Sequence, residues 1–149
     1  MNSGSGKNIF ETKKVDMKQF YKSLLALFIV GIAFVSCDDT LTNDDIDSRT
    51  IPASNVSYAE YIQPLFQLKC NTAGCHNSRD IAGGLSLDNH AEATSNVLIV
   101  FPELPDNSKL VWAIEGRTTS PMPPVGWPPL TKNQITGIKT WIKEGAKNN

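Results

Sequence analysis

The sequence predicts a small all-α domain with long loops, preceded by an N-terminal signal segment and a flexible tether. Two stretches, 57–70 and 131–145, carry apolar residues at helical spacing behind a helix-capping residue. Between them, segments rich in Gly, Asn, Ser and Pro favour loops. A chain of 149 residues with one targeting segment leaves room for a single domain with a modest core.

The first 36 residues have the pattern of a secretory signal. An apolar stretch over 20–35 is short for a membrane span, and basic residues lie at its N-terminal side. Met17 is an alternative start, since it opens a compact basic segment. The stretch ends in Phe34-Val35-Ser36-Cys37, which resembles the lipobox of bacterial lipoproteins. We therefore expect cleavage before Cys37 and acyl chains on its new N-terminus, the alternative being a plain signal peptide with an incidental cysteine.

The next segment, 37–54, is polar and acidic, with no aromatic residue and no hydrophobic period. This composition is typical of a flexible tether, and it predicts that the folded domain occupies residues 55–149. The whole chain has a formal net charge of −1, and loss of residues 1–36 would remove five lysines and two acidic residues. The exported part is then mildly acidic, which favours basic partner surfaces and gives no indication of nucleic-acid binding.

The first helix of the domain is expected to begin behind Ser57, where Ser57-Tyr58-Ala59-Glu60 has the form of a capping box, and to run toward Cys70. Pro64 lies inside this stretch and lacks a backbone donor, so we expect a kink or interruption near 60–64. Loop should dominate from 71 to 98, with a turn and a short extended piece at 83–88 and a brief helix at 89–94.

Two further helices are predicted in the C-terminal half. One should run from an N-cap at Ser108 to Glu115 and stop at Gly116. Residues 118–129 contain five prolines and must be extended. The last helix should begin at the capping box Thr131-Lys132-Asn133-Gln134, end at Gly145, and pack its apolar stripe against the first helix.

The run Cys70-Asn71-Thr72-Ala73-Gly74-Cys75-His76 carries the clearest chemistry in the chain. It sets two thiols ahead of an imidazole, which is the order that covalent haem attachment requires, with four residues between the cysteines instead of the usual two. Each thiol would add to a haem vinyl group, and His76 would supply the proximal nitrogen to the iron. Gly74 would allow the longer loop to turn sharply.

A low-spin haem needs a second axial ligand, and Met122 is the only methionine that remains after the signal is removed. Prolines at 121, 123 and 124 restrict the backbone around its thioether. His90 is the competing ligand, but it lies in a segment that resembles an exposed turn or helix start. An open or water-occupied sixth position is the remaining alternative.

These features, in this order, resemble a known family. From Tyr58 to Ala146 the chain is similar to the small c-type cytochrome domains in exported proteins of planctomycetes and Bacteroidetes. The resemblance rests on an internal proline, the widened Cys-His site, Gly-Gly-Leu-Ser-Leu-Asp at 83–88, Ser-Lys-Leu at 108–110, Met-Pro-Pro at 122–124 and a final helix ending Trp141 to Ala146. It implies a class I cytochrome c-like fold with one haem c on Cys70 and Cys75, His76 proximal and Met122 distal.

The resemblance implies an electron carrier rather than an enzyme, working with redox partner proteins near the membrane that holds Cys37, on its periplasmic side or at the cell surface. A haem with a weak Met122 bond would also react with peroxide. The haem should complete the core, and we expect its pocket among these residues: Leu65, Leu85, Leu87, Leu110, Trp112, Ile114 and Trp127.

Two readings without haem compete with this one. In the first, zinc is held by Cys70, Cys75, His76 and His90, although adjacent Cys75 and His76 would have to strain the loop to bind one ion. In the second, Cys70 and Cys75 form a disulfide in a lipid-anchored binding module, whose recognition surface includes the proline-rich segment.

Overall fold

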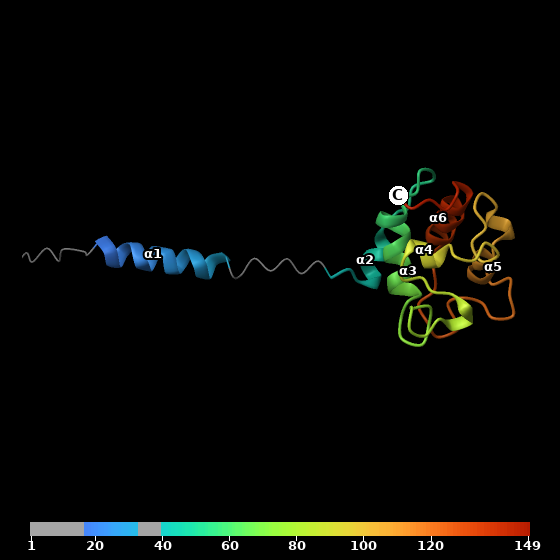
Figure 1. Cartoon of the computed structure of the whole chain (residues 1–149), viewed down its shortest axis with the longest axis horizontal. Coiled ribbons are helices and arrows are strands. Elements are labelled where there is room, and N and C mark those ends of the chain that lie inside the picture. Colours follow the sequence, from blue (N-terminus) through green and yellow to red (C-terminus); the bar gives the residue numbers. More distant parts are fainter. Residues whose placement is uncertain (1–16, 33–39) are drawn as a thin grey trace, which may run out of the picture. The chain divides into compact units, whose positions relative to one another are not determined.

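The computed structural model describes residues 17–32 and 40–149 of the chain (Figure 1). The chain divides into two compact units, Met1–Thr40 and Leu41–Asn149. In the first unit, helix α1 (Met17–Ile32) covers much of the apolar stretch that we interpret as a signal. None of the described helices is long and apolar enough to cross a membrane. The proposed cleavage site and lipid attachment at Cys37 lie outside the described residues.

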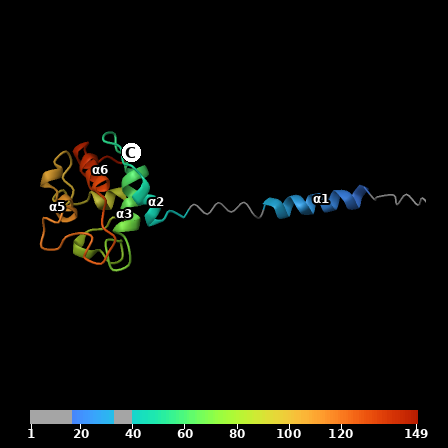
Figure 2. The same ribbon diagram turned by 180° about the vertical axis from the view of Figure 1, so that it is seen from behind.

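The second unit is helical, and no described residue lies in a strand, which confirms the all-α prediction. Its elements, seen from two sides in Figures 1 and 2, are α2 (Asn43–Ser48), η1 (Tyr58–Ile62), α3 (Gln63–Lys69), η2 (Ala82–Gly84), α4 (His90–Ala93), η3 (Pro105–Asn107), α5 (Lys109–Ile114) and α6 (Lys132–Lys143).

The first predicted helix forms in two pieces, as its proline requires. The Ser57 hydroxyl accepts a hydrogen bond from the backbone N–H of Glu60 at 3.2 Å and starts the π-helical turn η1. Helix α3 follows with Pro64 in its first turn, where a missing N–H costs nothing. The expected interruption near 60–64 is confirmed.

The core lies where α6 packs against η1 and α3, which confirms the predicted pairing of the last and first helices. Trp141 of α6 is fully buried, with its ring centroid 5.3 Å from that of Tyr58 and 6.2 Å from that of Phe66. Helix α6 begins at the predicted capping box, because the Thr131 hydroxyl and the Gln134 side chain each bond the other's backbone. It ends before Gly145, whose φ of +98° suits glycine.

Ser108 precedes α5 as predicted, but its hydroxyl does not cap the helix. It accepts from the Phe101 N–H at 2.8 Å and lies 3.2 Å from the Leu104 carbonyl oxygen, to which it donates. The buried hydroxyl therefore fixes the preceding loop instead of the helix start.

The structure differs from the expected flexible tether over 37–54 in its described part. Residues 43–48 form α2, started by a capping box between Thr42 and Asp45, and Ile46 and Ile51 are buried against the domain. Ile51 packs so closely on Gly137 of α6 that a Cβ there would lie 2.6 Å from it. The compact unit therefore begins at Leu41 rather than at residue 55.

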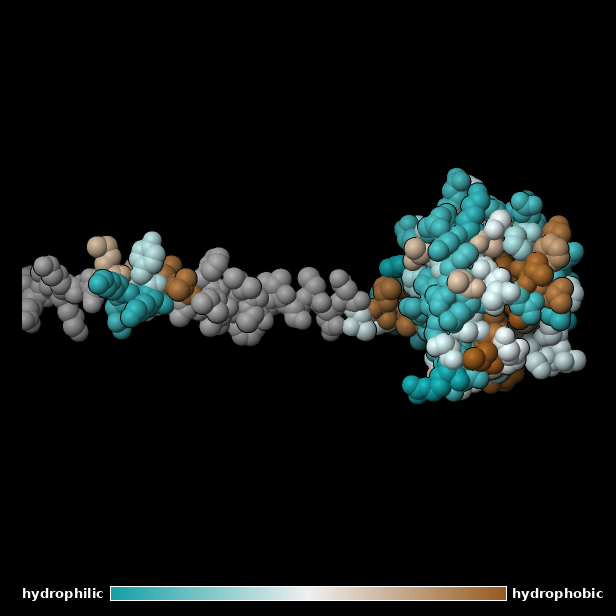
Figure 3. All heavy atoms as spheres, in the orientation of Figure 1, coloured by the Kyte–Doolittle hydropathy of each residue, from teal (hydrophilic) through white to brown (hydrophobic). Residues whose placement is uncertain are grey.

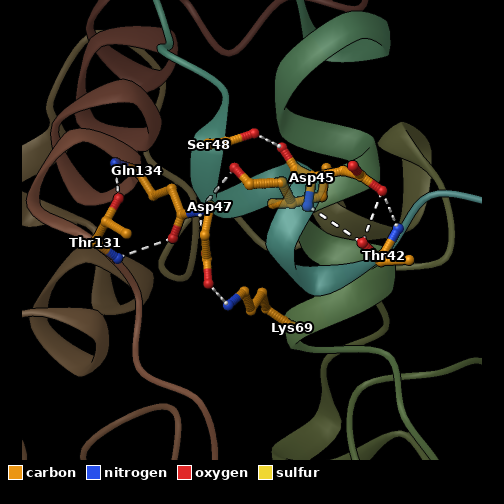
Figure 4. A network of polar contacts seen from close by, with 8 residues as sticks. Thr42, Asp45, Asp47, Ser48, Lys69, Thr131 and Gln134 are labelled. Atoms are coloured by element: carbon orange, nitrogen blue, oxygen red, sulfur yellow. Dashed lines mark hydrogen bonds and ion pairs between the residues drawn. The ribbon is translucent and has the colours of Figure 1, made fainter.

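Polar contacts fasten this segment to two helices of the domain (Figure 4). Asp47 pairs with Lys69 of α3 at 2.8 Å and accepts a hydrogen bond from the Gln134 side chain of α6 at 2.9 Å. The Lys69 hydrogen bond is the main cause that lowers the pKa of Asp47. The acidic composition that suggested a solvated tether thus includes a carboxylate with two specific partners.

Candidate functional site

A cavity of about 390 Å³ lies between the end of α3, the loops that follow it, helix α5 and the proline-rich segment. Cys70, Cys75, His76 and Met122 all line it, so four side chains that the sequence singled out come together at one place. Most of the exposed lining is apolar, as in pockets that hold organic ligands. Cys70 and Met122 are far apart in the sequence, and the fold brings them together.

Cys70 is fixed at the end of α3, where its N–H donates to the Phe66 carbonyl at 2.9 Å. Burial, followed by the neighbouring Cys75, raises the pKa of the Cys70 thiol to about 12. The thiol is therefore protonated at neutral pH. Both cavity cysteines are free thiols in the structure.

The loop after Cys70 turns back on itself and delivers Cys75 and His76 to the cavity. Gly74 has φ +81°, the left-handed conformation expected for a sharp turn. The His76 N–H donates to the Cys70 carbonyl at 3.1 Å, and the His76 carbonyl accepts from the Leu87 N–H at 2.7 Å. The His76 backbone is thus bonded on both sides.

Hydrogen bonds fix the His76 backbone but leave one atom of its ring without a partner. Its Nδ1 atom is buried and has no hydrogen-bond partner among the described residues. Histidines that bind metals usually donate from the second ring nitrogen to a fixed acceptor, which sets the ring orientation. In this chain the orientation of the ring must depend on the backbone and on packing.

Two carboxylates that the sequence analysis missed organise the same loop. Asp80 accepts from the Gly74 N–H at 2.6 Å and from the Asn77 side chain at 2.7 Å. Hydrogen bonds, first from Asn77 and then from Gly74, lower the pKa of Asp80. Asp88 accepts from the Ser78 N–H at 2.6 Å, and Ser78 hydrogen bonds, first from its side chain, lower the pKa of Asp88. The Gly-Gly-Leu-Ser-Leu-Asp pattern pointed to this segment but not to the carboxylate's partners.

Met122 enters the cavity from the proline-rich segment. Its N–H donates to the Ala113 carbonyl of α5 at 2.9 Å, and the peptide bond to Pro123 is cis. The side chain is partly buried and packs against the hydrophobic core. Its thioether sulfur is therefore available to the cavity from a backbone attached to α5.

The charged residues among the described lining are both cations, Lys69 and Lys109. Lys69 has a side chain that is only 1% exposed, and Asp47 balances its charge. Lys109 is exposed at the start of α5. No acidic residue of the described chain belongs to the lining.

Five of the residues predicted for the haem pocket line the cavity: Leu85, Leu87, Leu110, Ile114 and Trp127. Two predictions were wrong. Leu65 is fully buried in the helical core and does not line the cavity. Trp112 does not line it either: its Nε1 donates to the Asp106 carbonyl at 2.6 Å, and the Arg117 guanidinium lies over its ring. Helical periodicity identified both as apolar positions but could not say on which side the cavity lies.

His90 is absent from the described cavity lining. Its Nε2 lies 2.7 Å from the Ala146 carbonyl oxygen, and its ring packs edge-on against Tyr58 with centroids 4.9 Å apart. The four residues of the zinc hypothesis are therefore not brought together. Within the described ranges, no group of three or more His, Cys, Asp or Glu residues is placed to hold a metal ion.

The surface around these elements is mostly hydrophilic on the face shown in Figure 3, with apolar residues in separate patches. Among the exposed apolar side chains are Val125 and Trp127, which follow Met122 in the proline-rich segment. Trp127 is 46% exposed and also lines the cavity, so it marks one edge of the opening.

Residues 73–126 match the model of a protein family described as Planctomycete cytochrome C. The matched range contains Cys75, His76 and Met122 and begins after Cys70, so the first predicted anchor lies outside it. No curated protein and no solved structure matches the chain.

The donor set agrees with this family match. A cytochrome c family implies covalently bound haem c. The cavity supplies two free thiols, an imidazole whose Nδ1 is buried and unpartnered, and a thioether in mostly apolar surroundings. These are the groups that such a haem requires. Over residues 73–126 the chain is therefore similar to the family described as Planctomycete cytochrome C, and the match supports a small cytochrome c-like domain.

Proposed function

We propose that this protein is a monohaem c-type cytochrome that transfers electrons, with haem on Cys70 and Cys75 and with His76 and Met122 as axial ligands. The observation that carries the proposal is that all four side chains line one mostly apolar cavity. Covalently bound haem supplies an iron that cycles between the ferric and ferrous states.

Attachment uses the two thiols. Each sulfur would form a bond to one vinyl carbon, and the thiol hydrogen would go to the other carbon of the former double bond, so that no electrons are lost or gained overall. Because the Cys70 thiol is attached to the end of a helix and Cys75 to a hydrogen-bonded loop, both anchors start from fixed backbone positions. The unusual four-residue spacing is accommodated by the turn at Gly74.

The ligands and the lining set the electronic surroundings. A methionine sulfur at the distal position favours ferrous iron and raises the reduction potential relative to a second histidine. Apolar side chains such as Leu85, Leu110 and Ile114 line the cavity and would exclude water from a haem bound there. The chain's own contribution is therefore to hold the ligands and to keep the site dry.

Export and membrane attachment complete the proposal. Residues 1–36 would act as a lipoprotein signal, and acyl chains on Cys37 would hold the domain at a bacterial membrane, on its periplasmic side or at the cell surface. Its partners would be redox proteins that reach the cavity opening. The mildly acidic composition of the part after residue 36 favours basic surfaces on those partners.

The test is to produce the full chain in a host with a c-type haem maturation system, denature it, and measure its intact mass together with its pyridine haemochrome spectrum. We expect one haem-sized mass increment that survives denaturation and a spectrum in which both vinyl groups are consumed. Cys70→Ser and Cys75→Ser serve as matched variants, each leaving one vinyl group unreacted.

A haem-free mass two hydrogens short, with a control cytochrome matured normally in the same host, would overturn the proposal. It would mean a Cys70 to Cys75 disulfide and favour the binding module. A haem increment with one vinyl group left in the wild type would correct the proposal to a single thioether.

A further inference from the structure

One carboxylate holds both ends of the loop that carries Cys75 and His76. Asp88 accepts from the Asn71 side-chain N–H at 2.5 Å through Oδ1 and from the Ser78 backbone N–H at 2.6 Å through Oδ2. Asn71 directly follows Cys70, and Ser78 lies two residues after His76. The Asp88 side chain therefore bridges the loop at the points where it leaves the first cysteine and where it passes the histidine.

The backbone around Asp88 is hydrogen-bonded to helix α3 and to the His76 loop. Its backbone carbonyl accepts from the Gln63 side chain of α3 at 2.8 Å. The preceding residue, Leu87, is 1% exposed and donates its N–H to the His76 carbonyl at 2.7 Å. The carboxylate thus links the loop to an element that the core holds in place.

The His76 ring needs such support more than most metal-binding histidines do. Its Nδ1 has no hydrogen-bond partner among the described residues, so no acceptor of its own fixes the imidazole orientation. A spacer of four residues also leaves more backbone conformations to exclude than the usual spacer of two. Contacts that restrain the loop backbone therefore determine where the imidazole lies.

Asp80 provides a comparison within the same loop. Its partners, the Gly74 N–H and the Asn77 side chain, both lie within six residues of it. It closes a local turn on the exposed side and does not connect the loop to a buried element. Loss of Asp80 should loosen the turn around Gly74 while the connection of the loop to α3 through Asp88 is kept.

We propose that Asp88 is a positioning residue for His76: by bridging Asn71 and Ser78 it holds the widened loop in the form that presents the imidazole to the haem iron. The inference rests on the proposed haem function for its spectroscopic consequence. The bridging of the loop is independent of haem and can be tested without it.

The test compares the full-length wild type with Asp88→Ala, Asp88→Asn and the matched variant Asp80→Ala. Loss of the bridge should speed amide hydrogen exchange at Ser78 by about tenfold in Asp88→Ala, the effect of one lost hydrogen bond to a charged group. In the haem-loaded protein, the same variant should lose part of the low-spin ferric spectrum and show a shifted midpoint potential. Asp88→Asn, which keeps one carbonyl oxygen as an acceptor, should lie between it and the wild type.

Asp80→Ala should speed exchange at Gly74 and change the spectrum and the potential less than Asp88→Ala does. The inference is overturned if Asp88→Ala has the wild-type spectrum and potential, or if Asp80→Ala changes them equally. Should Asp88→Ala fail to fold, Asp88→Asn decides by the same readouts. A wild type without haem would overturn the proposed function, whereas faster Ser78 exchange in Asp88→Ala would still support the bridge.

Discussion

The two segments that wall the cavity are held by different physical means. The segment 70–88 carries the predicted anchors and proximal ligand, and side-chain hydrogen bonds from Asp80 and Asp88 fix its backbone. The segment 117–129 carries Met122 and has few such bonds, among them one from the Thr118 hydroxyl to the Ser120 carbonyl at 2.8 Å. Five prolines restrict it instead.

The difference shows two ways to hold a ligand on a loop. Hydrogen bonds stabilise the folded loop directly, and they depend on the charge state of the carboxylates that accept them. Prolines act largely through the unfolded chain, because they remove conformations that folding would otherwise have to exclude. The proximal side should therefore respond to pH and to carboxylate substitutions, and the distal side to changes in backbone stiffness.

The largest expected effect is at His76. His76→Ala should prevent accumulation of stable holoprotein, because the loop would then deliver two anchors but no proximal nitrogen. The yield of covalent haem per chain measures this. Normal six-coordinate haem in the variant would refute the proximal assignment. His90→Ala is the matched control, since His90 lies outside the cavity and should leave the ligation unchanged.

A smaller effect is expected at Met122, the proposed distal ligand. Met122→Ala should keep covalent haem, open the iron to added cyanide, and lower the midpoint potential on the order of 0.1 V, part of the ~0.8 V range that axial ligands span. Cyanide titration and potentiometry measure the two changes. Val125→Ala, in the same segment and fully exposed, should change neither. An unchanged spectrum and potential in Met122→Ala would remove Met122 from the site.

The pH dependence should separate the two sides. The pKa of Asp80 is lowered in the folded protein from its ordinary value of 3.8, so its stabilising effect is complete above that value and is lost as pH falls through the lowered pKa. The stability advantage of the wild type over Asp80→Asn should therefore be present at neutral pH and vanish at low pH. Urea denaturation at a series of pH values measures it.

Residues 117–129 contain no Asp or Glu, so the same titration gives no carboxylate contribution from the Met122 side. Pro121→Ala combined with the pH series is the appropriate comparison, because its stability difference from the wild type should be constant over this range. A stability difference for Asp80→Asn that does not change with pH would mean that the carboxylate charge is not what holds the proximal turn.

The smallest effect is expected for the stiffness of the distal segment. Pro121 is exposed, does not line the cavity and directly precedes Met122. Pro121→Ala should cost about 0.4–1 kcal/mol of stability and weaken the hold on the thioether, which added imidazole would displace more easily. Pro128→Ala, six residues beyond Met122, should cost similar stability but leave imidazole binding unchanged. Equal imidazole affinities in the two variants would argue against local stiffness as the cause.

Helices α3, α5 and α6 and the four cavity residues were predictable because each has a local signal. The capping box formed by Thr131 and Gln134 predicts the start of α6, and Pro64 predicts the interruption before α3. The spacing of Cys70, Cys75 and His76, together with the single methionine left after the signal, indicated a common site. The structure brings these residues to one cavity, and their role as haem ligands stays a prediction.

What could not be predicted depends on contacts between residues far apart in the chain. The side chain of Gln134 reaches Asp47, and that of Asn133 bonds the backbone of Ile51, so α2 packs on a helix more than eighty residues away. Leu65 and Trp112 show the same limit, because an apolar position does not reveal which side of a helix faces the cavity. Thr42 and Asp45 form a capping box at the start of α2, but the acidic composition of the segment led to the prediction of a flexible tether.

Through the ion pair between Asp47 and Lys69, the segment 41–54 affects the electrostatics of the cavity. No residue of 41–54 belongs to the described lining, yet Asp47 neutralises a buried ammonium group that does. In a protein shortened to begin at residue 55, the Lys69 ammonium at the cavity would have no compensating carboxylate. An uncompensated positive charge favours the reduced state of a redox centre bound nearby. If the cavity holds haem as proposed, measurements on such a shortened protein would overstate its reduction potential. The segment predicted to be a flexible tether would then contribute to the electrostatics of the cavity.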